Sequence, residues 1–264
     1  MNIKKFKYYL RIWWHLNVKN ILPVFNHNPT IIVFLIGKII RFTFFGGFIY
    51  FLLKGTNTLA GYSLNQTLFF FLTFNLIDII GQFLFREVYR FRPQIISGTF
   101  DFILTKPMSP LFRVLLGGAD ATDLITIPPL VILVWYIGNL LNPSGLAIFY
   151  YVILVLNGLV ISAAFHILVL AMGIITLEID HTVMIYRDLV GLGRFPIDIY
   201  KEPLRSLITF IVPIGLMISI PAKAFMGLIN PIGVISSVLF GMALFMLSLQ
   251  FWKYALKKYT SASS

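Results

Sequence analysis

The stretch that decides the fold is GLAIFYYVILVLNGLVISAAFHILVLAMGIIT, residues 145–176, in which no side chain carries a formal charge. As a single helix that rises about 1.5 Å per residue, it would be about 48 Å long, whereas the hydrocarbon core of a bilayer is about 30 Å thick. Two spans would need more residues and a turn between them. We therefore expect one long, tilted membrane helix that projects into the cytoplasm.

The composition of the whole chain supports the same class. Hydrophobic residues make up 58% of the 264 residues and charged residues 12%, whereas about 25% of a soluble domain is charged. The sequence has no GxxxxGK(S/T), GxGxxG or HExxH motif, and its lack of cysteine excludes disulfides, thiol chemistry and cysteine-ligated metals. In a membrane protein, the net charge of +11 indicates basic cytoplasmic loops rather than nucleic-acid binding.

Six segments are long and apolar enough to cross a bilayer, which takes about 20 residues. They are residues 31–53, 66–84, 124–141, 145–176, 204–220 and 231–252. Residues 1–28 have apolar side chains at helical spacing with lysines among them, which predicts an amphipathic helix in the membrane interface. No cleavable signal peptide is visible. We expect an all-α integral membrane fold, with residues 1–264 forming one transmembrane domain.

Lysine and arginine gather in four segments that six spans place on one side of the membrane. These segments precede the first span, join the second to the third, join the fourth to the fifth, and follow the last. The third of them contributes Arg187, Arg194, Lys201 and Arg205. Because basic loops stay in the cytoplasm, both termini are predicted to be cytoplasmic, with Lys54 and Lys223 outside.

The fifth predicted span is short and contains Pro213. It is followed by PAKAFMGLINP, residues 221–231, which is apolar but too short to cross the membrane. Such a segment is consistent with a re-entrant or interfacial position on the outer side, where protein covers its backbone.

Polar residues within the spans are candidates for a translocation pathway. Asn75 and Asp78 are three residues apart and share one helix face, and a carboxylate at this depth faces the protein interior or a cavity. They could form part of a translocation pathway or a proton site. Alternatively, they pair with Lys38 or Arg41 of the first span, and we favour this pairing. Further candidates for the pathway, or for simple packing, are Asn157 and His166.

Two further carboxylates, Asp120 and Asp123, lie in GGADATD, residues 117–123, where the third span begins. They could bind a cation. They also fit the start of a helix, where the dipole favours acidic side chains. We favour the second interpretation and predict no metal site.

The segment RPQIISGTFDFILTKPMSPLFR, residues 92–113, is a stiff and charged insertion between two apolar spans. Thr99 is expected to cap a helix that begins at Phe100, with Asp101 in its first turn. We expect Lys106 in the last turn and Pro107 to end the helix. Phe100, Ile103 and Leu104 share one face, and because so short a helix is unstable alone, that face should pack on the bilayer or in a groove of another protein.

These features resemble the ABC type-2, exporter-type permeases that work with separately encoded ATPase subunits. The positions similar to the family's cytoplasmic coupling segment, within residues 93–107, are Gly98, Asp101, Leu104, Lys106 and Pro107. Residues 193–227 also look like this family, with matching positions at Gly193, Arg194, Pro196, Tyr200, Pro203, Leu204, Arg205, Pro213 and Pro221.

The resemblance implies a mechanism and partners. Two permease subunits, alike or different, would pair above two ATPase subunits that bind ATP and magnesium, so this chain would be no enzyme by itself. Phe100, Ile103 and Leu104 would fill a groove of the ATPase, and Asp101 and Lys106 would orient the contact. A second coupling element is expected in residues 182–200, through Tyr186, Arg187 and Asp188. The chain would export a substrate across a bacterial plasma membrane, surrounded by lipid.

Other classes of function remain open at the level of sequence. An ion-coupled secondary transporter would use Asp78 and would contain inverted repeats, which the sequence does not reveal. A lipid-processing membrane enzyme would bind a metal through Asp120 and Asp123. A non-transporting assembly subunit is a further alternative.

Overall fold

The computed structural model describes residues 3–27, 30–177 and 179–260, and 84% of the chain is helical. The described part contains no β-strand. Five helices are long and apolar enough to cross a membrane, or six if a bent helix pair forms one span. The predicted all-α membrane fold is therefore confirmed.

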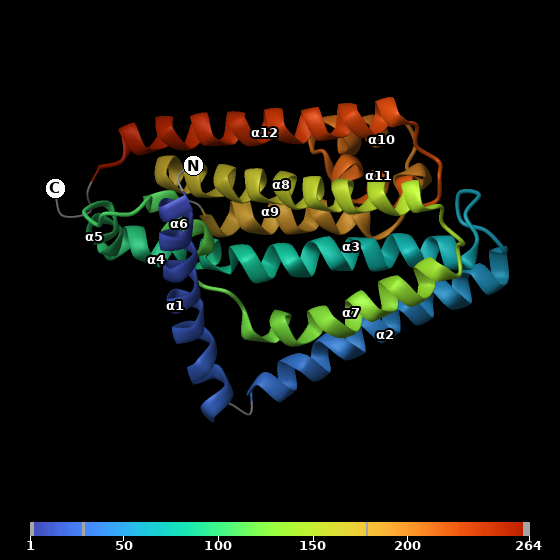
Figure 1. Ribbon diagram of the computed structural model, residues 1–264, viewed down its shortest axis with the longest axis horizontal. Coiled ribbons are helices and arrows are strands. Elements are labelled where there is room, and N and C mark those ends of the chain that lie inside the picture. Colours follow the sequence, from blue (N-terminus) through green and yellow to red (C-terminus); the bar gives the residue numbers. More distant parts are fainter. Residues whose placement is uncertain (1–2, 28–29, 178, 261–264) are drawn as a thin grey trace.

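The five long helices lie side by side as a bundle (Figure 1). They are α2 (Thr30–Thr56), α3 (Leu64–Phe85), α7 (Ala121–Asn139), α8 (Gly145–Thr176) and α12 (Pro231–Lys258). The uncharged stretch that opened the sequence analysis forms one helix with the expected bounds, and it begins where the Ser144 hydroxyl accepts a hydrogen bond of 3.2 Å from the backbone of Ala147. α8 lies at the centre of the bundle, packed against α12, α3 and α11.

Small residues let α8 approach its neighbours closely. A Cβ atom on Gly158 would lie 2.6 Å from the carbonyl oxygen of Met217, and one on Gly241 of α12 would overlap the side chain of Asn157. These seams need glycine because a side chain would push the backbones apart. Close backbone packing of this kind is a main source of helix association in membranes.

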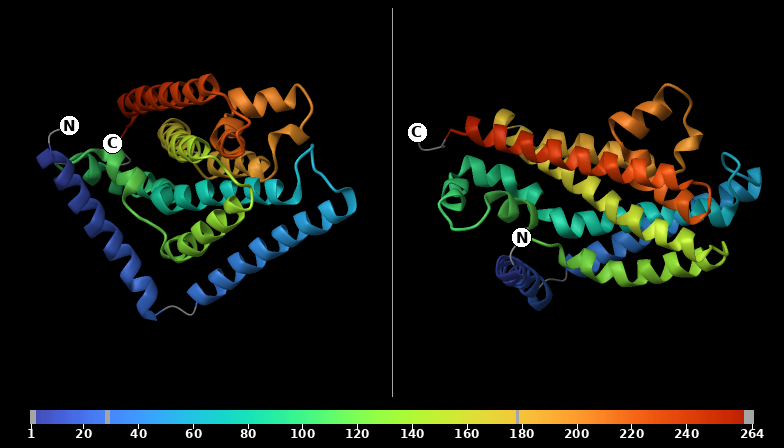
Figure 2. Two further views of the ribbon diagram at one scale, coloured as in Figure 1. Left: turned by 45° about the vertical axis from the view of Figure 1, so that its right-hand side comes forward. Right: turned by 45° about the horizontal axis from the view of Figure 1, so that its top comes forward.

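One end of the bundle carries a group of short helices. α3 continues through η1 (Arg86–Arg90) into α4 (Phe91–Ile96), and α5 (Thr99–Leu104) and α6 (Pro110–Leu116) follow. Helix α1 (Ile3–His27) lies at this same end, inclined to the bundle (Figures 1 and 2). It is attached to the segment before α7, because the Asn20 side chain donates a hydrogen bond of 3.0 Å to the carbonyl of Gly117. The apolar side chains Ile3, Phe6, Leu10 and Trp14 remain exposed.

The segment between α8 and α12 folds back along the bundle, which differs from the predicted cytoplasmic loop and fifth span. α9 (Ile179–Gly191) begins beside the end of α8 and runs back along it (Figure 1). η2 (Leu192–Arg194) and η3 (Ile197–Ile199) follow. The carboxylate of Asp198 accepts hydrogen bonds of 3.0 Å from the Tyr62 hydroxyl and 2.9 Å from the Lys223 ammonium.

This contact corrects the position of residues 182–200. The sequence analysis placed them in a cytoplasmic loop and placed Lys223 outside, on the opposite side of the membrane. The ion pair shows that the segment reaches the far end of the bundle. A count of loop charges did not reveal that Arg187 and Arg194 line cavities within the bundle.

The predicted fifth span, residues 204–220, is a bent segment rather than one straight helix. The segment consists of α10 (Leu204–Ser206), the π-helical turns η4 (Leu207–Ile211) and η5 (Gly215–Ser219), and α11 (Ile220–Phe225). Its two halves meet at an angle of 75°. The break falls at Val212 and Pro213, because proline has no N–H to continue the helical ladder and its ring clashes with the preceding turn.

Candidate functional site

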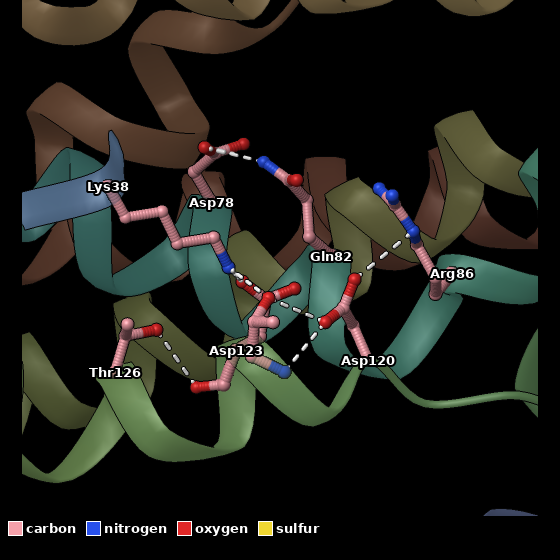
Figure 3. A network of polar contacts seen from close by, with 8 residues as sticks. Lys38, Asp78, Gln82, Arg86, Asp120, Asp123 and Thr126 are labelled. Carbon is pink, nitrogen blue, oxygen red and sulfur yellow. Dashed lines mark hydrogen bonds and ion pairs between the residues drawn. The ribbon is translucent and has the colours of Figure 1, made fainter. Parts of the chain in front are cut away.

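Charged side chains from α2, α3 and α7 gather near the end of the bundle that carries α1 (Figure 3). The Lys38 ammonium of α2 lies 2.5 Å from the carboxylate of Asp123 and 2.7 Å from the hydroxyl of Thr122, both on α7. The Asp123 side chain is only 3% exposed. The predicted pairing of Lys38 with Asp78 or Asn75 is therefore wrong, because the first turn of α7 supplies a closer carboxylate, whereas Arg41, the other predicted partner, lines the same small cavity as Asp78.

Asp120 is the N-cap of α7, as the preferred interpretation expected. Its carboxylate accepts a hydrogen bond of 2.8 Å from the backbone N–H of Thr122 and lies 3.3 Å from the Arg86 guanidinium. Burial alone would raise the pKa of Asp120, but the Thr122 hydrogen bonds and the charge of Arg86 hold it below its usual range. Among the described residues, no group of three His, Cys, Asp or Glu side chains is placed to hold a metal ion.

Asp78 lies deeper along α3, among arginines. Its carboxylate accepts a hydrogen bond of 2.8 Å from Gln82, one helical turn further on. A small cavity around it, of about 40 Å³, is also lined by Arg41, Arg187 and Arg194. This positive surrounding opposes the binding of a cation at Asp78, which weakens the ion-coupled alternative.

The remaining pathway candidates each form a side-chain hydrogen bond to a backbone carbonyl. Asn75 donates a hydrogen bond of 2.7 Å to the carbonyl of Phe71 on its own helix. Asn157 donates one of 2.9 Å to the carbonyl of Ser237, and so joins α8 to α12. The His166 Nδ1 donates a hydrogen bond of 2.8 Å to the carbonyl of Ser162, its Nε2 is buried without a hydrogen-bond partner among the described residues, and the ring lines the same small cavity as Asp78.

A larger cavity of about 510 Å³ lies next to this cluster, between α1, α2, α3 and α7. Its charged walls are formed by Lys38, Arg41, Arg86, Arg90, Asp120, Asp123 and Arg187. A second cavity, of about 210 Å³, shares Lys38 and Arg41 with it and is otherwise mainly apolar. Sequence reasoning identified each arginine but not their convergence, because Arg187 and Arg194 come from a segment that it placed outside the bundle.

The short helix α5 presents a different surface from the predicted one. Phe100 is fully buried, with its ring centre 5.0 Å from that of Phe91 and 5.1 Å from that of Tyr259. Ile103 is only 4% exposed. Both side chains are covered by this chain itself, so the prediction that they fill a groove of a partner is wrong. The side chain that points outward is Phe102, which is 70% exposed.

The other residues predicted for this surface lie around α5. The helix begins one residue earlier than expected, after Gly98, whose φ of +69° favours glycine. Asp101 accepts a hydrogen bond of 2.8 Å from the Tyr259 hydroxyl, and burial together with the Asp101 charge raises the pKa of that phenol to about 12. Leu104 is partly exposed at 37%, and Lys106 and Pro107 are exposed beyond the end of the helix.

The predicted second coupling element faces the interior in part. The Tyr186 hydroxyl lies 3.3 Å from that of Ser162, and its ring centre is 5.0 Å from that of His166. Arg187 lines the large cavity, while Asp188 is exposed. Of the three residues, only Asp188 is placed so that it could contact a partner without lining or filling the bundle.

Comparison with known proteins identifies the class of chain to which this arrangement belongs. No curated protein and no solved structure gives a significant match. Residues 38–263 match the family described as ABC-2 family transporter protein, a region that contains the five apolar bundle helices except the first turns of α2, and that leaves out α1. Because the match covers most of the sequence, the protein belongs to the ABC-2 family of transporter membrane proteins.

Proposed function

We propose that this chain is the permease subunit of an ATP-binding-cassette exporter and forms half of a translocation pathway. Membership of the ABC-2 transporter family supports this function. The sequence has no phosphate-binding loop, so ATP and magnesium would be bound by a separate ATPase subunit. Two such ATPases would work with two permease subunits, which are copies of this chain or a related one.

The observation that carries the proposal is the two-sided packing of α5. Its inner face is held by Phe91 at the extension of α3 and by Tyr259 just beyond α12. Its outer face leaves Phe102 exposed at the end of the bundle, with Ile96 of α4 exposed to 60% nearby in sequence. An exposed aromatic side chain on a short helix is the kind of anchor that a groove on another protein accepts.

This arrangement provides a mechanical connection between an ATPase and the charged cavity. A partner that moves α5 would also move η1 and the end of α3, because α5 packs on α4, and α4, η1 and α3 form one run of helix from Leu64 to Ile96. Asp78, Gln82 and Arg86 all belong to that run and line the cavities. ATP-driven closure beneath α5 would thus alter the walls of the pathway.

The outer surface of the bundle fits a subunit that pairs within the membrane. α2 is long and apolar enough to cross a membrane, and its side chains Ile32, Phe34, Phe44 and Phe51 are exposed. Lipid or a second permease subunit would cover this face. The α5 end would lie in the cytoplasm of a bacterium and the membrane would be its inner membrane, with both termini on the cytoplasmic side.

Co-expression with candidate ATPase subunits tests this function. The complete chain is purified through a tag, and the co-purified ATPase and its ATP hydrolysis are measured. Phe102→Ala should remove most of the bound ATPase, while Trp14→Ala, at an exposed aromatic residue of α1, should leave it unchanged. Retention of the ATPase by Phe102→Ala, or failure of every candidate ATPase to bind the wild type, would contradict the proposal.

A further inference from the structure

The walls of the 510 Å³ cavity carry more positive than negative charge. Five basic side chains and two acidic ones line it. Lys38 and Arg86 are held by Asp123 and Asp120, at 2.5 Å and 3.3 Å. Arg90 lies 3.6 Å from Glu87. The local carboxylates are therefore already engaged with three of the five cations.

Arg41 and Arg187 remain, and they line both this cavity and the small cavity around Asp78. Arg194 joins them there, and its guanidinium lies 5.7 Å from the centres of the Phe45 and Phe74 rings. Among the described residues, Asp78 is the one carboxylate that lines the small cavity. A single carboxylate cannot neutralise three arginines, so the small cavity keeps a net positive charge. An anionic ligand would supply the missing charge.

The neighbouring 210 Å³ cavity gives the ligand a second property. It shares Lys38, Arg41, Gln82 and Asp123 with the charged cavity, and its apolar walls include Phe42, Ile79 and Leu130. Ile39 also lines it and is 62% exposed on α2, so the apolar cavity reaches the outside of the bundle, where lipid chains would lie. A cationic compartment thus adjoins an apolar one that opens sideways.

We infer that these two cavities bind an amphiphile with a phosphate or carboxylate head and an apolar tail. The head lies between Arg41 and Arg187, because guanidinium groups bind such oxyanions through paired, charge-assisted hydrogen bonds. The tail lies in the apolar cavity between α2 and α7. The role of this amphiphile as cargo rests on the proposed function, whereas its binding requires no ATPase.

Equilibrium binding to the purified full chain in an uncharged detergent tests the inference. Three fluorescent probes share one acyl chain and differ in the head, which is a phosphate monoester, a phosphocholine or a trimethylammonium group. The phosphate probe should bind at least about tenfold more tightly than either of the others, because only its net negative head meets the unpaired arginines. Equal affinity for the three heads would overturn the inference, and this comparison needs no variant.

Variants locate the site. Arg41→Gln should weaken binding of the phosphate probe about tenfold, whereas Arg41→Lys, which keeps the charge but loses the paired guanidinium hydrogen bonds, should weaken it less than Arg41→Gln does. Lys54→Gln removes a positive charge from the last turn of the same helix, away from the cavity, and should have no effect. Equal weakening by Arg41→Gln and Lys54→Gln would show a general surface-charge effect and overturn the assignment of the site.

Competition distinguishes an amphiphile from a free anion. The unlabelled phosphate monoester with the same chain should displace the probe, and inorganic phosphate at the same concentration should not. If both displace it equally, the tail contributes nothing and the site is one for a small anion, which overturns the amphiphile inference. If the chain binds the phosphate probe selectively but binds no ATPase, only the proposed function is refuted. If the chain binds an ATPase but does not prefer the phosphate probe, only this inference is refuted.

Discussion

Replacing Phe100 by alanine should destabilise α5 far more than replacing Phe102. The Phe100 side chain is fully buried and contacts the rings of Phe91, Trp252 and Tyr259. Truncating a phenylalanine in such a core costs about 3–5 kcal/mol. Phe102 is 70% exposed, and a surface substitution of this kind changes stability by about 0.5 kcal/mol or less.

Hydrogen exchange measured by mass spectrometry on peptides that cover residues 91–106 separates the two variants. Because α5 can open locally, a loss of about 3–5 kcal/mol should speed exchange of its amides by about 10²- to 4 × 10³-fold in Phe100→Ala. Exchange in Phe102→Ala should stay close to wild type. If Phe102→Ala accelerated exchange as strongly as Phe100→Ala, or if neither did, the assignment of the inner and outer faces of α5 would be refuted.

Two further predictions concern the bundle and its far end. Gly158→Ala should lower thermal stability by about 1–3 kcal/mol, as overpacking does, because the new methyl group would lie 2.6 Å from the Met217 carbonyl; an unchanged melting temperature in detergent would contradict the close seam. Asp198→Asn should also lower the melting temperature at neutral pH. Although burial raises the pKa of Asp198, the hydrogen bond and charge of Lys223 hold it below the usual range. The contribution of the ionised Asp198 carboxylate to stability is therefore present above a pH of about 4 and is lost as the pH falls through the lowered pKa. The difference in melting temperature between variant and wild type should shrink in acid. A difference that persists in acid would show that the ion pair is not its cause.

Features that depend on the length of a segment and on its local chemistry could be predicted from the sequence. An uncharged run long enough to cross the membrane, with Ser144 before it, specifies α8 with its observed bounds. Asp120 at the start of α7 follows in the same way from the preference of helix N-termini for acidic caps. The amphipathic pattern of residues 1–28 likewise corresponds to α1, whose apolar side chains are exposed.

Features that depend on distant partners could not be predicted. Helical periodicity grouped Phe100 with Ile103 on one face, but whether that face points inward depends on Trp252 and Tyr259, about 150 residues later in the chain. The spacing of Lys38 and Arg41 marked them as members of a polar face, yet the choice of Asp123 as partner is set by how α2 crosses α7.

The break at Pro213 had a local signal, and the position of the arginines did not. A proline within an apolar run is tolerated in some membrane helices and breaks others. The 75° bend therefore could not be predicted without knowing how the surrounding helices pack. Arg187 and Arg194 were counted as loop charges because charge statistics do not distinguish a basic loop from a basic cavity wall. Their convergence with Arg41 on the space around Asp78 is a property of the folded bundle.

The central claim is that the outer face of α5 docks on a separate ATPase subunit. The sequence contains no cysteine, so a single cysteine introduced by Phe102→Cys is a specific attachment point for a maleimide that carries a photoreactive benzophenone, which crosslinks to whatever protein lies beside it on illumination. In membranes that contain the ATPase, Phe102→Cys should give a crosslinked band with it, and Phe44→Cys, on the exposed face of α2, should not. Crosslinking from Phe44→Cys but not from Phe102→Cys would place the ATPase elsewhere and contradict the account.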